Sequence, residues 1–261
     1  MKVEADLMRK IIHFSQTSLL ETYSELADLK THFQVLNNES GLAAKELLNK
    51  QIDIIELGTG DFELFKPLLP TLDLKTSRFG MADTLVKFKT DFRPMHVLSD
   101  SVYKAILTKV PDLKTSESAV VIGDYDFVLA LTYKLAQSGF NKIIIATYKN
   151  SDAEKIKKLI LVYAFGIKIS TVPLSELTQL ESGSVLLISN LSRINNPEAY
   201  ESITYFNFLS RGAAFIDLCS RNEPVLAEEA RRAEITVIDE IEILKIKYGM
   251  ILELFKNSSL V

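Results

Sequence analysis

The sequence has little cysteine and little histidine. Among its 261 residues it has one cysteine, Cys219, and three histidines. A single cysteine excludes a framework of disulfides and indicates a reducing compartment, the cytoplasm. The cysteine and the histidines also lack the close spacing of zinc ligands. We therefore expect a cytoplasmic protein without disulfides and without a metal site.

Long apolar runs and an excess of positive charge are missing as well. No stretch reaches the roughly 18 consecutive apolar residues of a membrane helix, and residues 1–14 lack the apolar core of a signal peptide. The net charge is −4, which gives no electrostatic reason to expect a nucleic acid partner. The composition, with 47% hydrophobic and 25% charged residues, is that of a globular protein with one large or two modest domains. We expect neither a membrane nor a nucleic acid as a partner.

The second half of the sequence alternates strands with helices. Short β-branched runs predict strands at residues 118–123, 142–147, 167–172, 184–189, 213–218 and 235–239. Helical periodicity predicts helices at residues 126–139, 152–164, 174–180, 197–210, 225–233 and 240–255. This alternation implies βαβ units and a parallel sheet, and the fully apolar strands fit a sheet that is covered on both faces. We predict an α/β fold with a doubly wound, Rossmann-like domain.

The first hundred residues have a mixed pattern of their own. They predict strands at residues 32–36, 52–57 and 84–89. Between and after these strands, the pattern predicts helices near residues 17–29, 40–50, 61–68 and 99–110. No internal repeat or long linker interrupts the chain. This half therefore predicts an N-terminal α/β domain that precedes the Rossmann-like one.

Four segments carry a family signature. They include the motifs PLL, LSDS, VVIG and FIDL, and they lie in residues 67–86, 95–106, 120–150 and 215–255. In order and spacing they resemble the motifs of the shikimate dehydrogenases over nearly the whole chain. The resemblance implies a substrate-type domain of residues 1–103 plus 240–261 and a nucleotide-binding-type domain of residues 104–239. It also implies NADP-dependent hydride transfer to a small cyclic keto-acid.

The catalytic pair of that family is a lysine and an aspartate beside the reacting hydroxyl group, where they transfer a proton. The aspartate position matches Asp100, whereas the lysine position falls on Phe62, which cannot transfer a proton. Lys66 follows one helical turn later, about 5.4 Å along a helix, and is the candidate replacement. The alternatives are a solvated lysine at Lys66 and a helix N-cap at Asp100.

The substrate-binding positions are largely exchanged. The family's Ser-x-Ser pair, which contacts the substrate carboxylate, matches Ser15 and Thr17, although the two hydroxyl groups could instead cap a helix. Asp83 and Leu98 replace two asparagines, and Lys247 replaces a glutamine. Sites built on hydrogen bonds discriminate strongly between substrates. We therefore do not expect shikimate itself to bind, and the positive charge of Lys247 leaves a different acid open as a ligand.

The cofactor positions are also altered. Of the glycines that admit a pyrophosphate in the first turn, only Gly123 is present, and Asp124 and Tyr125 follow it. A carboxylate at this point repels a dinucleotide and occupies the anion site. The family's N-R-T motif becomes Thr147, Tyr148 and Lys149, so that a lysine replaces the arginine that contacts the 2′-phosphate. We expect no NADP binding, or weak binding only.

The sequence therefore favours a non-catalytic or strongly diverged relative of the shikimate dehydrogenases. Its partner would be a small carboxylic acid or another protein, and its oligomeric state is open. One alternative is an active NAD(P)-dependent oxidoreductase for a different small hydroxy- or keto-acid. Another is a module similar to glutamyl-tRNA reductase. That enzyme needs a nucleophilic cysteine in its N-terminal domain, whereas Cys219 lies in the second half of this chain.

Overall fold

The chain folds into two compact units. The computed structural model describes residues 8–15, 18–38, 41–193, 197–219 and 224–258. Unit 1 comprises Met1–Leu98 and Leu244–Val261, and unit 2 comprises Ser99–Ile243. The boundaries expected from the sequence, after residues 103 and 239, differ from these by a few residues. No helix in the described part of the chain is long and apolar enough to cross a membrane.

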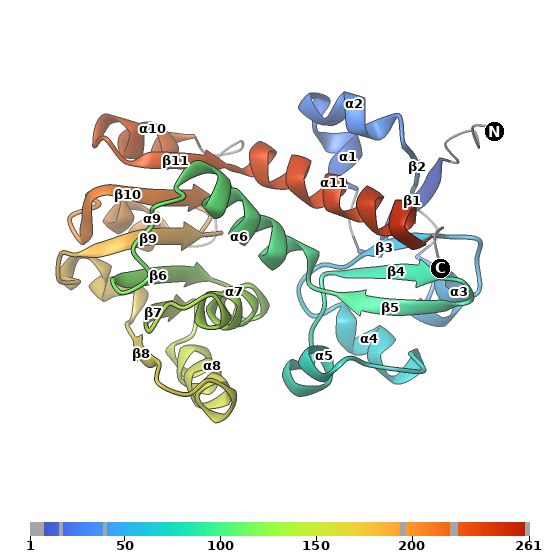
Figure 1. Ribbon diagram of the computed structural model, residues 1–261, viewed down its shortest axis with the longest axis horizontal. Coiled ribbons are helices and arrows are strands. Elements are labelled where there is room, and N and C mark those ends of the chain that lie inside the picture. The colour runs from blue at the N-terminus through green and yellow to red at the C-terminus, as the bar shows by residue number, and fades with distance from the viewer. Residues whose placement is uncertain (1–7, 16–17, 39–40, 194–196, 220–223, 259–261) are drawn as a thin grey trace. The chain divides into compact units, whose positions relative to one another are not determined.

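Unit 1 is built on a mixed sheet of five strands in the order β2-β1-β3-β4-β5 (Figure 1). The strands are β1 (Arg9–His13), β2 (Phe33–Leu36), β3 (Ile54–Glu56), β4 (Thr84–Phe88) and β5 (Asp91–Met95). Strand β1 runs parallel to β2 and β3, whereas β4 runs antiparallel to β3 and β5. The helical segments are α1 (Leu19–Thr22), η1 (Ser24–Leu26), α2 (Ala27–Lys30), α3 (Ala44–Leu48), α4 (Phe62–Phe65), η2 (Lys66–Leu68) and α5 (Leu74–Phe79).

The prediction for this half missed three elements: β1, α5 and β5. Strand β5 contains Pro94, and a proline in the sequence argues against a strand prediction. The proline is tolerated here because β5 is an edge strand. Helix α5 is short, but Asp73 caps its first turn and Gly80 ends it with a φ of 66°. The expected long helix at 17–29 is wrong, because the chain forms the separate turns α1, η1 and α2 instead.

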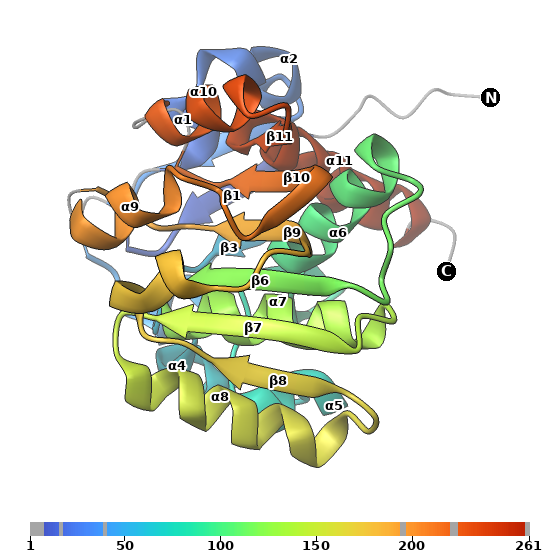
Figure 2. The same cartoon turned by 90° about the vertical axis from the view of Figure 1, so that its left-hand side faces the viewer.

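Unit 2 contains a parallel sheet of six strands in the order β11-β10-β9-β6-β7-β8, stacked from top to bottom in Figure 2. The strands are β6 (Ser118–Gly123), β7 (Lys142–Thr147), β8 (Lys168–Thr171), β9 (Ser184–Ser189), β10 (Leu209–Asp217) and β11 (Thr236–Asp239). The helices that lie in this unit wholly or in part are α6 (Val97–Lys109), α7 (Tyr125–Gln137), α8 (Asn150–Tyr163), η3 (Leu174–Gln179), α9 (Pro197–Ile203), α10 (Val225–Arg232) and α11 (Glu240–Ser258). Helices α6 and α11 each contain a boundary between the units.

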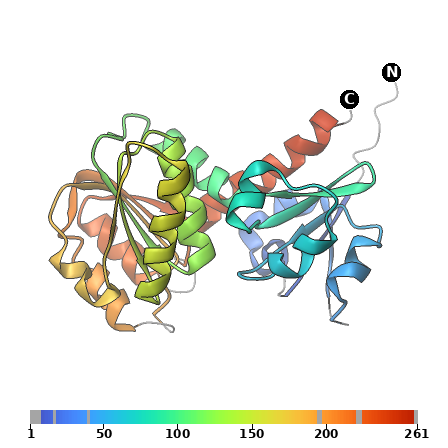
Figure 3. The ribbon, with the colours of Figure 1, turned by 90° about the horizontal axis from the view of Figure 1, so that it is seen from below.

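Helices cover both faces of this sheet. Figure 3 shows α7 and α8 side by side along one face. On the other face, η3, α9 and α10 bury apolar side chains with those of β6, β9 and β10. The strand order is that of a Rossmann domain, so the predicted doubly wound parallel sheet is confirmed. The helix expected at 197–210 is wrong beyond Ile203, because β10 already begins at Leu209.

Candidate functional site

The turn that follows β6 is closed by the side chain of Asn190. Gly123 is the last residue of β6, and Asn190 directly follows β9, the neighbouring strand. A Cβ atom at Gly123 would lie 1.8 Å from Oδ1 of Asn190 and 2.9 Å from Cδ1 of Phe127. Atoms cannot approach so closely, so any larger residue here would have to displace the Asn190 and Phe127 side chains, and glycine fits the turn whether or not a nucleotide binds.

Asp124 and Asn190 form a clasp of hydrogen bonds across this turn. The Asp124 carboxylate accepts from the backbone N–H of Phe127 at 3.1 Å and from Nδ2 of Asn190 at 2.7 Å. The backbone N–H of Asp124 donates to Oδ1 of Asn190 at 3.3 Å. Asp124 is thereby the N-cap of α7. Its carboxylate lies where a helix N-terminus would otherwise bind a phosphate group.

These residues do not fit the dinucleotide that the sequence resemblance implies. A pyrophosphate needs the space beside Gly123 and unpaired N–H groups at the start of α7. The Asn190 side chain fills that space, and the Asp124 carboxylate takes the Phe127 N–H group. At the end of β7, the Thr147 hydroxyl donates to the backbone oxygen of Lys149 at 2.7 Å. Burial, helped by the charge of Asp126, raises the pKa of Tyr125 and keeps its phenol neutral. Lys149 remains as an exposed cation.

Asp100 forms an ion pair within unit 2. Its Oδ1 atom lies 2.7 Å from Nζ of Lys134 on α7, and Nζ also lies 5.2 Å from the ring centre of Tyr103. The Asp100 and Lys134 side chains are 38% and 23% exposed, so solvent weakens the attraction. The suggestion that Asp100 is an N-cap is wrong, because α6 begins three residues earlier, at Val97.

The position that the sequence resemblance assigns to the catalytic lysine is occupied by a core residue. Phe62 is 3% exposed and belongs to the apolar core of unit 1 together with Phe65 and Leu85. Lys66 lies in η2, and its Nζ atom is 4.0 Å from the Glu63 carboxylate. About a third of the Lys66 side chain is exposed. Lys66 therefore has the surroundings of a solvated lysine with a weak surface ion pair.

Unit 1 holds a buried cluster of polar side chains around Glu56. At the end of β3, Oε1 of Glu56 accepts from Nζ of Lys247 and from the hydroxyl of Tyr248, both at 2.8 Å. Its Oε2 accepts from the hydroxyl of Ser18 at 2.9 Å. Glu56 is 1% exposed, Lys247 6% and Tyr248 fully buried. The lysine expected to attract a ligand carboxylate is thus paired inside the protein.

Opposing effects set the charge states in this cluster. Burial alone would raise the pKa of Glu56, but the charge of Lys247 and hydrogen bonds from Lys247 and Tyr248 outweigh burial and lower it. Burial alone would lower the pKa of Lys247, but the charges of Glu56 and Asp83 outweigh burial and raise it. Burial lowers the pKa of His13, which therefore stays neutral. Glu56 and Lys247 form a charged pair at neutral pH.

Two further residues expected at the substrate site have internal partners. The Asp83 carboxylate accepts from the backbone N–H groups of Val97 and Leu98, at 3.0 and 3.1 Å, and so caps the start of α6. The Ser15 hydroxyl donates to Asp61 at 2.7 Å. Thr17 lies outside the described residues. Among the described residues, no group of His, Cys, Asp and Glu side chains could hold a metal ion.

The sequence analysis did not identify three residues that hold these sites together, namely Asn190, Glu56 and Lys134. Asn190 follows a predicted strand, a position where polar residues often serve a site, but no motif marks it. Glu56 is a carboxylate inside an apolar strand, which indicates a buried partner. That signal cannot identify Lys247, which lies 191 residues away. Lys134 lies within a helical pattern, and only the packing of α6 against α7 brings it to Asp100.

Comparison with solved structures identifies the fold. The chain is 14% identical to shikimate 5-dehydrogenase from Listeria monocytogenes, determined in complex with shikimate and NAD, with a TM-score of 0.72 over 95% of this chain and 91% of that one. Quinate dehydrogenase from Corynebacterium glutamicum, in complex with NAD, gives 14% identity and a TM-score of 0.74 over 95% and 93%. The 5-ketofructose reductase of Gluconobacter sp. strain CHM43, in a ligand-free form, gives 14% identity and a TM-score of 0.70 over 94% of this chain and 91% of that one.

The chain therefore has the two-domain fold of the shikimate and quinate dehydrogenases. No protein-family model matches the sequence. A comparison with curated protein sequences also finds no match. At this level of identity the likeness is one of fold, and the site residues have to be judged by their own geometry.

Replacing Lys247 with methionine tests the buried pair. The variant K247M leaves the Glu56 charge buried without its cation, and we expect it to lower the free energy of unfolding of unit 1 by about 3–5 kcal/mol. The double variant K247M/E56Q removes both charges and should recover part of that loss. Urea unfolding, followed by circular dichroism, measures the difference. If the double variant is as unstable as the sum of both single variants, the two side chains do not interact as described.

Alkaline pH should destabilise unit 1. The pKa values of Lys247 and Tyr248 are raised from 10.5 and 10.0, so their contribution to stability is complete below pH 10.0 and is lost as the pH rises through the folded-state values. We expect the urea midpoint to fall on the alkaline side of pH 10, and to fall less steeply in the Lys247→Met variant. An identical alkaline profile in both proteins would contradict the assignment.

Proposed function

We propose that this protein shares the fold of the shikimate dehydrogenases but is not catalytic. It does not carry out NADP-dependent oxidoreduction of shikimate. It uses the two-domain fold as a scaffold for a small ligand or for a protein partner. The observation that carries this proposal is the clasp between Asp124 and Asn190 at the turn after β6. Phe62 in the core and the paired state of Lys247 support it.

The clasp opposes a dinucleotide by charge as well as by space. A phosphate group that approached within 4 Å of the Asp124 carboxylate would be repelled by about 4 kcal/mol at an effective dielectric constant near 20. A loss of that size corresponds to roughly a thousandfold in affinity. The hydrogen bond from the Phe127 N–H to Asp124 would also have to break before this donor could bind a phosphate. Both effects act in the same direction.

The substrate side of the scaffold is closed to a shikimate-like acid for a similar reason. A carboxylic acid needs an unpaired cation or unpaired N–H donors. Lys247 donates to Glu56, and the N–H groups of Val97 and Leu98 donate to Asp83. A second carboxylate beside Glu56 and Asp83 would add repulsion rather than attraction. The residues are organised to stabilise the protein itself, which favours a binding role elsewhere on the scaffold.

Calorimetric titration with NADP and NAD tests the proposal. We expect no binding tighter than about 1 mM for either cofactor. The shikimate 5-dehydrogenase from Listeria monocytogenes, whose complex with NAD is known, serves as a positive control under the same conditions. The variant D124S keeps an N-cap hydroxyl but removes the charge, and D124S/N190A also opens the turn. We expect these variants to gain affinity stepwise. Binding of NADP by the unaltered protein below about 100 μM contradicts the proposal.

The alternative is an oxidoreductase for a different small hydroxy- or keto-acid. It is favoured by the ion pair between Asp100 and Lys134, which retains a lysine beside the family's aspartate position. If the alternative holds, NADPH or NADH should reduce a member of a panel of small keto-acids, and both D100N and K134M should abolish that rate. The variant K158Q, on the exposed surface of α8, serves as the control. We expect no turnover above that of a protein-free sample.

A further inference from the structure

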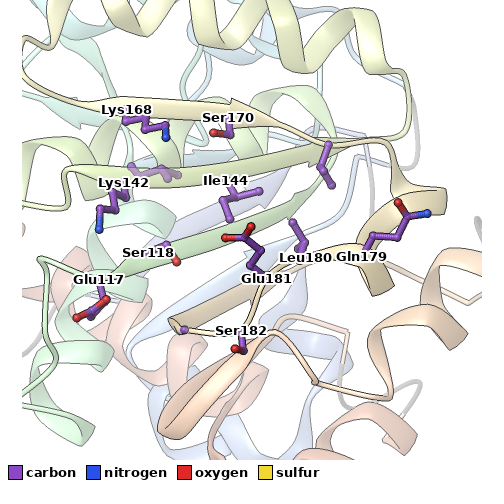
Figure 4. Close-up of a pocket in the computed structure, with 13 residues that line it drawn as sticks. Glu117, Ser118, Lys142, Ile144, Lys168, Ser170, Gln179, Leu180, Glu181 and Ser182 are labelled. Carbon is purple, nitrogen blue, oxygen red and sulfur yellow. The ribbon is translucent and has the colours of Figure 1, made fainter.

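Unit 2 contains a groove that is separate from the turn at Gly123. The groove has a volume of about 490 Å³ and lies over the first residues of strands β6, β7 and β8, whereas Gly123 is the last residue of β6. In Figure 4, Lys142 and Lys168 lie at one end of the groove, Gln179 lies at the other, and Glu181 lies between them. A groove of this size is large enough for a small organic molecule.

The groove exists because the connection between β8 and β9 is short. Instead of a full helix, the chain forms the six-residue segment η3. Its side chains Leu174 and Leu177 pack against Val120, Ile122 and Ala146 in the core. Over the first residues of the strands on this face, the described residues that line the groove come from the strands, from residues directly next to them and from residues 179–183, and none belongs to an α-helix. The first residues of these strands include Ser118, Lys142, Lys168 and Ser170. This row of side chains forms part of the floor of the groove.

Two lysines stand opposite each other in this row. Lys142 and Lys168 are direct partners in the parallel register of β7 and β8, and adjacent strands lie about 4.8 Å apart. Like charges directly opposite each other on one face of a sheet are destabilising. Within the described part of the chain, neither lysine forms an ion pair or a hydrogen bond through its side chain. An anion between the two ammonium groups would relieve this repulsion.

The rest of the groove adds two other kinds of group. Glu117 and Glu181 provide carboxylates, and in the described part of the chain neither forms an ion pair with the two lysines. Ile144, Val172 and Leu180 form a partly buried apolar floor. A ligand that satisfies the groove therefore has a negative group, a positive group and an apolar body.

We infer that this groove binds a small zwitterion with an apolar side chain, either a free amino acid such as leucine or a short apolar peptide. The ligand's carboxylate is held by Lys142 and Lys168, with the hydroxyl group of Ser170 beside it, whereas the Ser118 hydroxyl is bonded to that of Ser184 at 2.8 Å. Its ammonium group is held by the Glu181 carboxylate, and its side chain lies on Ile144. This inference does not rest on the proposed function, because no residue of the groove belongs to the clasp or to the Glu56 cluster.

Methyl NMR of the full chain tests it, with the Ile144 δ1 methyl group as the reporter. The probes are leucine and the dipeptide Leu-Leu, together with leucinamide, which lacks the carboxylate, and 4-methylpentanoate, which lacks the ammonium group. We expect leucine or Leu-Leu to shift the Ile144 signal with a Kd of about 1 mM or lower. The two single-charge analogues should bind about tenfold more weakly than leucine. The protein variants K142Q, K168Q and E181Q should bind leucine about tenfold more weakly than the unaltered protein does. Tighter binding of leucine would identify the ligand as a free amino acid, and tighter binding of Leu-Leu would identify it as a short peptide.

Matched variants at a distance keep the test specific. K158Q on α8 and E198Q on α9 exchange exposed charges outside the groove, and we expect both to bind as the unaltered protein does. The inference is overturned if neither leucine nor Leu-Leu shifts the Ile144 signal. It is also overturned if 4-methylpentanoate binds as tightly as leucine, since the site would then recognise only an anion. Equal weakening by K158Q and K142Q would show a general charge effect and overturn it as well.

Discussion

The carboxylate of Glu56 sets the main constraint on unit 1. A buried carboxylate without a partner costs several kcal/mol, and here it receives hydrogen bonds from Lys247, Tyr248 and Ser18. Glu56 belongs to the first chain segment of the unit, and Lys247 and Tyr248 to the C-terminal segment. The cluster therefore joins the two segments of a discontinuous unit. Any replacement of Lys247 has to deal with the Glu56 charge as well.

The same principle governs the turn after β6 in unit 2. A helix N-terminus attracts an anion, and in this protein Asp124 provides that anion from within the chain. Asn190 then holds Asp124 in place from the neighbouring strand. In each unit, a position that could receive a negatively charged ligand is already neutralised by a residue of the protein. This common feature connects the two units and is the physical basis of the proposed loss of catalysis.

The groove over the first residues of β6, β7 and β8 has the opposite character. Its charged side chains are not paired with each other among the described residues, and its floor is partly apolar. Charges that stabilise the fold are paired at 2.7–2.8 Å elsewhere in the chain. Paired charges contribute to stability, whereas unpaired and solvated charges remain able to bind a ligand. The contrast makes the groove, rather than the turn at Gly123, the part of unit 2 most suited to binding.

The sequence by itself determined the doubly wound sheet, because apolar strands and amphipathic helices are local patterns that a linear sequence retains. The sequence also identified Phe62 and Asp124 as departures from the dehydrogenase motifs. Each departure is a change of residue type at a single motif position, so it can be recognised without knowing the residue's partners. The sequence analysis missed β5 and α5, whose signals are short or contain proline. Only the tertiary structure decided that Lys247 is paired with Glu56, Asp100 with Lys134, and Asp124 with Asn190. These pairs join residues 34 to 191 positions apart, and the charge that a side chain offers to a ligand depends on which partner folding brings to it.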